Sequence, residues 1–223
     1  MVSHFRVAST KSAQHPAFRA SVRSKKEAVT LSDETLFIQS LKGRDKRAFE
    51  QLIAKFQTPI FNLLFRMTGV REEAEDLAQE VFITVYRKID LFRGESPLAT
   101  WIYRIAYNLC MNRRKYLGRR RDRDRQPFEE VVERNIVGSG TMSTSAQVSR
   151  PDEMAEGLQM ERLIQEAITA LDDEQRVILV LRDVQNMSYE SISDITGLPA
   201  GTVKSRLHRA RMALKERLSP HLR

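Results

Sequence analysis

The chain has 223 residues, with 37 Lys and Arg against 29 Asp and Glu, which gives a formal net charge of +8. Its 41% hydrophobic content argues against a wholly disordered chain, and 9 Gly and 7 Pro are too few for a turn-rich all-β protein. The single cysteine, Cys110, excludes an internal disulfide and a multi-cysteine metal site, and fits a reducing, cytoplasmic compartment. We therefore expect an all-α fold of two small helical domains joined by a flexible linker.

The positive charge is unevenly distributed along the chain. Residues 99–125 carry nine basic against two acidic residues, and residues 176–223 carry nine against four. Between these blocks, residues 126–175 reverse the balance, with three basic and eleven acidic residues. Two basic blocks separated by an acidic one indicate two polyanion-facing surfaces, and salt is expected to weaken the contacts of both.

The first 30 residues are rich in Ser, Ala, Arg and Lys, lack hydrophobic periodicity and contain Pro16. This composition predicts a disordered N-terminal tail over residues 1–30. The segment also resembles a transit peptide, since it is Arg- and Ser-rich with no acidic residue before Glu27. A start codon placed too far upstream is a third interpretation. No apolar core follows the early charges, so a secretory signal is not predicted.

Residues 31–118 show helical periodicity throughout and are expected to form the first domain. A first helix is expected to end at Gly43, and a second to begin near Asp45, with Pro59 bending or breaking it. A third helix is expected over about 72–89. On it an apolar residue recurs every four positions and predicts a core-facing stripe, formed by Leu77, Val81, Val85 and Ile89.

A fourth helix is expected to have Ser96 as its N-cap and Pro97 at its first position. One face is an apolar row, and the other mixes aromatic residues, a guanidinium and an amide. Such a face suits single-stranded nucleic acid, because an unpaired base can stack on a ring and present its edge to an amide. An ordinary helical bundle with buried tyrosines would look similar, and Trp101 is expected in the core. The mixed face consists of Thr100, Tyr103, Arg104, Tyr107, Asn108, Met111 and Lys115.

Residues 119–152 lose this periodicity and contain Gly, Ser, Thr and Pro in a pattern typical of a flexible linker. The second domain is expected over residues 153–223 and ends in a helix-turn-helix. In that motif Ser188 caps a short helix, Gly197 permits the left-handed turn, and Pro199 starts the second helix.

The second helix of this motif has a buried-type row at Val203, Leu207, Ala210 and Leu214 and polar residues on its other faces. Such a helix fits the DNA major groove, where Arg can donate two hydrogen bonds to guanine and Ser or Thr can contact bases or phosphates. A solvated basic face is the alternative interpretation. The candidate DNA-contacting residues are Thr202, Lys204, Ser205, Arg206, His208, Arg209 and Arg211.

Two groups of motifs resemble the extracytoplasmic-function sigma factors of the sigma-70 family, close to the sigma-E type. Residues 76–83 (DLAQEVFI), 86–87 (YR), 92–96 (FRGES) and 100–108 (TWIYRIAYN) are similar to region 2 of that family. Residues 189–192 (YESI) and 201–211 (GTVKSRLHRAR) are similar to its region 4 helix-turn-helix. The resemblance runs from about residue 31 to residue 218 and is interrupted only by the linker.

The resemblance implies an alternative sigma factor that binds core RNA polymerase, recognises the −35 and −10 promoter elements and promotes DNA melting. Residues Asp76, Gln79 and Glu80 would dock on the clamp coiled coil of the β′ subunit, and region 4 would meet the β flap. The last helix would read the −35 element. The residues implied at the −10 element are Phe92, Arg93, Ser96, Arg104, Tyr107, Asn108 and Lys115.

The family resemblance also implies control by an anti-sigma factor and a stress or envelope regulon. The acidic linker, with Glu129, Glu130 and Glu133, would thread the RNA-exit side of the polymerase.

Two other functions are consistent with parts of the sequence. A stand-alone helix-turn-helix regulator would bind duplex DNA without polymerase, as a symmetric dimer on paired half-sites. A metal-dependent nuclease would need ligands from several elements, whereas the acids between Glu72 and Glu80 lie within about three turns of one helix. The histidines His4, His15, His208 and His221 lack zinc-ligand spacing. We therefore expect neither enzymatic activity nor a metal or other cofactor.

Overall fold

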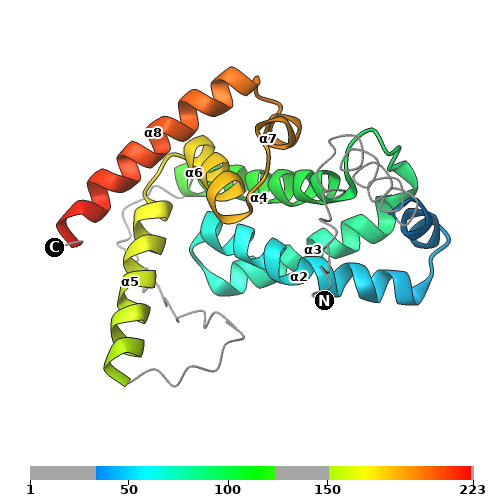
Figure 1. Ribbon diagram of the computed structural model, residues 1–223, viewed down its shortest axis with the longest axis horizontal. Coiled ribbons are helices and arrows are strands. Elements are labelled where there is room, and N and C mark those ends of the chain that lie inside the picture. Colours follow the sequence, from blue (N-terminus) through cyan, green and yellow to red (C-terminus); the bar gives the residue numbers. More distant parts are fainter. Residues whose placement is uncertain (1–33, 124–150, 222–223) are drawn as a thin grey trace, which may run out of the picture. The chain divides into compact units, whose positions relative to one another are not determined.

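The computed structural model describes residues 34–123 and 151–221, and every regular element in them is a helix (Figure 1). The all-α expectation is therefore confirmed for this part of the chain. The chain divides into two compact units, residues 1–50 and 51–223, which we describe separately. The predicted tail over 1–30 and most of the predicted linker lie outside the described residues. None of the described helices is long and apolar enough to cross a bilayer.

The first unit contains a helix over 34–42 and the start of α2 (Lys46–Thr68). The first helix ends as predicted at Gly43, whose N–H donates to the carbonyl of Gln39 over 2.8 Å. Arg44 takes the positive φ of the turn, +60°. Asp45 then caps α2, because its Oδ1 accepts the N–H of Ala48 over 2.7 Å.

Helix α2 is continuous, so of the two effects predicted for Pro59 the break is wrong, while the bend stays a prediction. Proline removes one backbone donor and disfavours a helix interior. Here the apolar row continues on both sides of it, with Phe56, Ile60 and Leu64 all buried. Burial of that row is the physical reason why α2 runs through the proline to Thr68.

Helices α3 (Arg71–Lys88) and α4 (Leu98–Arg123) pack against each other, with the 3-10 turn η1 (Ile89–Leu91) between them in the chain. The stripe predicted on the third helix is buried: Leu77, Val81, Val85 and Ile89 are each at most 1% exposed. Helix α4 begins one residue later than predicted, immediately after Pro97. It also continues to Arg123, beyond the predicted boundary at Gly118, because the basic residues there are favourable at a helix C-terminus.

The C-terminal part of the second unit is formed by α5 (Pro151–Thr169), α6 (Asp173–Leu179), the π-helical turn η2 (Val180–Val184), α7 (Tyr189–Thr196), α8 (Ala200–Leu218) and η3 (Ser219–His221). Helices α7 and α8 form the predicted helix-turn-helix. Ser188 caps α7 by accepting the N–H of Ser191 over 3.1 Å, and Gly197 has the left-handed φ of +73°. Pro199 directly precedes α8 rather than opening it.

A buried arginine links this part of the second unit to α2. Arg176 is 3% exposed, and its guanidinium donates to the carbonyls of Ile168 at 3.0 Å, Leu171 at 2.7 Å and Met67 at 2.7 Å, and also to that of Thr169. Most of these carbonyls belong to the C-terminal end of α5 and the turn after it, where the helix leaves acceptors unpaired. The Arg176 side chain therefore caps the C-terminal end of α5 and, by its hydrogen bond to the Met67 carbonyl, connects α5 to the end of α2.

Candidate nucleic-acid interface

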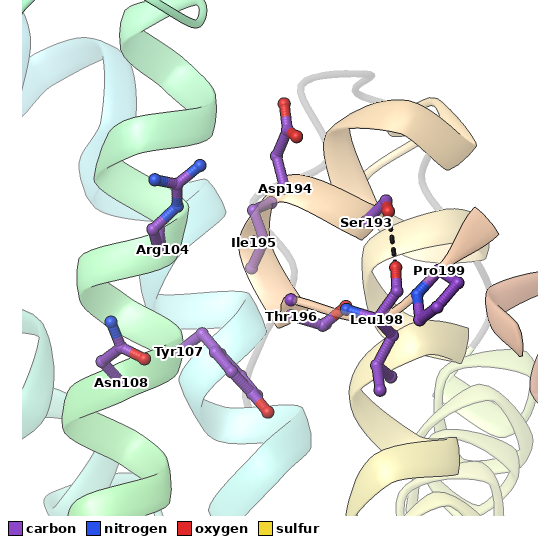
Figure 2. Close-up of a pocket in the computed structure, with 10 residues that line it drawn as sticks. Arg104, Tyr107, Asn108, Ser193, Asp194, Ile195, Thr196, Leu198 and Pro199 are labelled. Carbon is purple, nitrogen blue, oxygen red and sulfur yellow. Dashed lines mark hydrogen bonds between the residues drawn. The ribbon is translucent and has the colours of Figure 1, made fainter.

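A cavity of about 650 Å³ lies between α4 and the turn that follows α7 (Figure 2). Arg104, Tyr107 and Asn108 line it from α4, where spacings of three and four residues place them on one face. Residues 193–199 line the opposite side. Three of the residues predicted to contact the −10 strand therefore share one cavity, and their amide, phenol and guanidinium are the groups that the sequence pattern anticipated.

A second cavity, of about 540 Å³, is formed by the loop between η1 and α4. Its lining includes the predicted residues Phe92, Arg93 and Ser96 and again Arg104, which is common to both cavities. Gly94 lets the loop turn, since its φ of +77° is one that side chains rarely adopt. The loop and the face of α4 thus form two adjoining cavities around one guanidinium.

Two aromatic residues of the second cavity are in contact in a tilted arrangement. The centroids of the Phe92 and Trp101 rings lie 5.4 Å apart, and the two ring planes are inclined at 55°. Phe92 is buried, so this predicted DNA-contacting residue lies beneath the loop and supports it. Trp101 is half-buried and lines the cavity. The expectation that Trp101 lies in the core is therefore wrong, and its closeness in sequence to the FRGES loop is the signal that could have indicated the cavity.

Lys115 is not brought together with the other predicted residues. It lines a separate cavity of about 550 Å³ with Met111 and Arg114. Seven residues along a helix correspond to a rise of about 10 Å, so Lys115 is two turns from Asn108. The structure therefore divides the predicted −10 set into one group at the two adjoining cavities and one distant lysine.

The electrostatic environment of the first cavity is unusual at two side chains. The Nε of Arg104 is buried and has no hydrogen-bond partner among the described residues. Burial, followed by the nearby Glu174 carboxylate, raises the pKa of Tyr107. A tyrosine phenol is protonated at neutral pH and can donate a hydrogen bond, and the raised pKa of Tyr107 extends this state to more alkaline pH. The Arg104 guanidinium retains an unused donor. Both groups suit a ligand rich in acceptors.

The predicted DNA-contacting residues of α8 fall into two groups, because two of its arginines are paired with acidic side chains of the same chain. Arg206 pairs with Glu174 of α6. Arg211 makes a two-point contact with Asp183, from Nε to Oδ2 at 3.0 Å and from Nη2 to Oδ1 at 2.6 Å, which raises the pKa of Arg211. Thr202 is half-buried, and the exposed members of the set are Lys204, Ser205, His208 and Arg209. The Lys204 ammonium lies 5.5 Å from the centre of the Tyr189 ring.

Helix α3 carries the residues predicted to dock on polymerase. Asp76, Gln79 and Glu80 are exposed on one face. Oε2 of Glu80 lies 3.7 Å from Nη2 of Arg113 in α4. Ile83 and Tyr86 follow at helical spacing and are 50% and 48% exposed, which is high for large apolar side chains. Both lie off the buried stripe by helical spacing, which is the signal in the sequence that they are surface residues.

Comparisons with known proteins place these features in a family. Models of sigma-70 region 2 and of sigma-70 region 4 match residues 52–123 and 161–214. The RNA polymerase sigma-H factor of Pseudomonas aeruginosa is 33% identical over 195 residues, which cover 87% of this chain and 98% of that protein. The ECF RNA polymerase sigma-E factor of Haemophilus influenzae is 33% identical over 193 residues, which cover 86% and 98%.

A solved structure agrees with these matches. The sigma factor RpoE of Bartonella quintana, crystallised with the anti-sigma factor NepR, has a TM-score of 0.61 at 25% identity. The match covers 77% of this chain and 96% of that chain.

Region 2 followed by region 4 defines a transcription initiation factor of the sigma-70 class, which acts with RNA polymerase on promoter DNA. The chain belongs to the extracytoplasmic-function (ECF) sigma factors of this class. The resemblance carried by residues 76–108 and 189–211 is thereby confirmed.

Proposed function

We propose that this chain directs core RNA polymerase to promoters by binding an unpaired −10 strand at α4 and duplex −35 DNA at α8. The observation that carries the proposal is the gathering of Arg104, Tyr107 and Asn108 around one cavity. No bond is made or broken on DNA in this activity, since binding of an extruded base offsets the few kcal/mol of unstacking. The cytoplasm, where core polymerase acts, is the compartment we assign.

In this proposal each side chain around the α4 cavities has a role. An extruded base stacks on Tyr107 or Trp101, and the amide of Asn108 pairs with its Watson–Crick edge. Arg104 donates to the backbone of the strand through donors that include its unpaired Nε. Arg93 and Ser96 contact the adjacent nucleotides from the loop, while Lys115 would meet DNA two turns further along α4.

At the −35 element we propose that α8 enters the major groove. Lys204, Ser205, His208 and Arg209 are exposed on it and can reach base edges or phosphates. Thr202, near the start of the helix, lies where a hydroxyl can contact the backbone. Arg206 and Arg211 also belong to the predicted set, but Arg206 is paired with Glu174 and Arg211 with Asp183.

Polymerase docking is proposed for the exposed face of α3. Asp76, Gln79 and Glu80 provide charged and polar contacts, and Ile83 and Tyr86 add apolar area to the same face. A mixed face of this kind is typical of protein interfaces, which have an apolar centre and a polar rim. The partner we assign to it is the clamp coiled coil of β′, with the β flap assigned to region 4.

We also propose that an anti-sigma factor controls this chain. The related RpoE of Bartonella quintana was crystallised with the anti-sigma factor NepR. Residues of α4 and α7 line the cavity that we assign to the −10 strand, so a partner that covers both helices at this cavity would block DNA capture.

In vitro transcription with core polymerase and a promoter library tests the proposal. We expect initiation that depends on the chain, and permanganate footprints that show a melted region near −10. Asn108→Ala should reduce melting and leave polymerase binding intact, whereas Asn112→Ala, one turn along α4, should leave both unchanged. A folded chain that supports no initiation would overturn the proposal. Tight, specific duplex binding without polymerase would instead favour a stand-alone regulator.

A further inference from the structure

Two acids in front of the helix-turn-helix hold arginines of the recognition helix. Glu174 lies in the first turn of α6 and pairs with Arg206. Asp183 lies in η2 and pairs with Arg211 through both carboxylate oxygens. A two-point guanidinium–carboxylate contact fixes direction as well as distance, which a single hydrogen bond does not. Both arginines are therefore engaged by the protein itself.

The two pairs flank the buried row of α8. Val203, Leu207 and Ala210 are at most 2% exposed and mark the direction in which the helix faces its own domain. At 3.6 residues per turn, Arg206 and Arg211 lie ~70° to either side of that direction. Ser205, His208 and Arg209 cluster on the opposite side. A turn of α8 about its axis would therefore lengthen one pair or the other.

We infer that Asp183 and Arg211, together with Glu174 and Arg206, are positioning residues that set the rotation of α8 and so determine which base edges Ser205, His208 and Arg209 reach. The inference rests on the proposed reading of −35 DNA by α8 and deepens it. It removes Arg211 and Arg206 from the set of residues proposed to contact base edges directly. It adds two acids, Asp183 and Glu174, to the residues on which promoter specificity depends.

Because Asp183 is negatively charged, its removal should affect promoter binding in opposite directions under the two explanations, electrostatic repulsion and positioning. Removing an acid next to DNA normally strengthens binding to any sequence, since phosphates are repelled less. A positioning acid has a second effect, because its loss frees α8 to rotate and weakens binding to the correct sequence only. Asp183→Asn should therefore leave binding to unrelated duplex unchanged or stronger and weaken binding to the promoter.

The experiment uses the full chain with core polymerase and two duplexes: a promoter selected by the wild-type holoenzyme from a random library, and the same promoter with its −35 block scrambled. The measured quantity is the ratio of the two affinities, which does not change if part of the protein is unfolded. We expect D183N to lower this ratio about tenfold, comparable with the loss of one base contact. Glu216→Gln, which removes an exposed acid further along α8, should leave it unchanged.

Variants of Arg211 separate positioning from direct contact. R211Q should lower the ratio as D183N does, and R211K should do the same, since an ammonium cannot make the two-point contact. The double variant should be no worse than either single variant. Lys215→Gln, which removes a charge of the same sign from α8, should leave the ratio unchanged.

Three results would overturn the inference. They are a wild-type ratio in D183N, a wild-type ratio in R211K, and additive losses in the double variant. A salt dependence reduced by about one phosphate contact in R211Q alone would assign Arg211 to direct DNA binding. If the wild-type holoenzyme itself did not distinguish the two duplexes, the proposed −35 function would fall, and the positioning role with it.

Discussion

The phenol of Tyr103 in α4 donates a hydrogen bond to Oε1 of Gln185, which follows η2, over 2.7 Å. The amide of Gln185 in turn donates to the carbonyl of Pro59 over 3.2 Å. Gln185 therefore joins α2 and α4 at a point where Tyr103 is only 6% exposed. A buried phenol without this partner would be costly.

Gln185→Leu should lower the free energy of unfolding by about 1–3 kcal/mol, because it leaves the buried Tyr103 hydroxyl unpaired. Urea unfolding followed by circular dichroism measures the change. Gln159→Leu, at an exposed position of α5, is the matched control and should change stability much less. Equal stabilities for the two variants would show that the Tyr103–Gln185 contact contributes little.

Arg176→Ala should be among the most destabilising single substitutions in region 4. It removes a buried guanidinium that satisfies carbonyls of Met67, Ile168, Thr169 and Leu171. We expect a loss on the order of 3–5 kcal/mol in thermal or urea unfolding. Arg176→Lys should recover only part of it, since an ammonium cannot reach four carbonyls at once. Full recovery by lysine would mean that charge alone matters at this position.

Alkaline pH should destabilise the fold through two buried groups. Burial raises the pKa of Cys110 from 9.0 to about 12 and that of Tyr103 from 10.0 to about 12. The unfolded chain loses these protons first, so the free energy of unfolding falls from about pH 9 upward until the folded-state values are passed. The slope approaches ~1.4 kcal/mol per pH unit for each group.

Two substitutions assign this pH dependence. Cys110→Ala should remove the part that begins near pH 9, and Tyr103→Phe should remove a part that begins near pH 10. Denaturant unfolding at a series of pH values gives the curves. An unchanged slope in Cys110→Ala would exclude the thiol as a source.

The intrinsic fluorescence of the chain should report on strand binding, because its one tryptophan, Trp101, lines the loop cavity. A single-stranded oligonucleotide carrying the −10 sequence of the non-template strand should quench this emission, since a base that stacks nearby changes the environment of the ring. Asn108→Ala should weaken the quenching, and Asn112→Ala should not. Equal quenching by an oligonucleotide of scrambled sequence would indicate binding by charge alone.

Core polymerase binding should depend on the apolar part of the α3 face. Ile83→Glu places a charge at the centre of that face and should weaken binding to core polymerase at least tenfold, as buried interface positions do. Fluorescence anisotropy of labelled chain measures the affinity. Ile53→Glu, at an exposed isoleucine of α2, is the matched control. Equal effects of both substitutions would argue against a specific docking role for Ile83.

Helix positions and the buried rows were predictable from the sequence because they follow from local spacing and capping. Ser188, Gly197 and the stripe from Leu77 to Ile89 are examples in which periodicity and turn chemistry agree. The continuity of α2 through Pro59 was not predictable, since burial of residues distant in the chain outweighs a local preference. The length of α4 beyond Gly118 was likewise missed, because loss of apolar periodicity does not by itself end a helix.

The candidate site was predictable at the level of residue types and much less at the level of contacts. Spacing placed Arg104, Tyr107 and Asn108 on one face, and the structure gathers them as expected. The pairing of Arg206 with Glu174 and of Arg211 with Asp183 joins residues that are 28 or more positions apart. No helical or strand periodicity connects such positions. The sequence alone therefore could not distinguish the basic residues of α8 that face DNA from the arginines that are paired with acids.

The lining of the α4 cavity by the α7 turn has a consequence for measured affinities. A strand held by Arg104, Tyr107 and Asn108 would occupy space that residues 193–199 now border. Residues 193–199 form one wall of this cavity, so the measured strand affinity depends on that wall as well as on the three α4 side chains. Substitutions on α7 would thus change the measured strand affinity although the three α4 side chains stay the same.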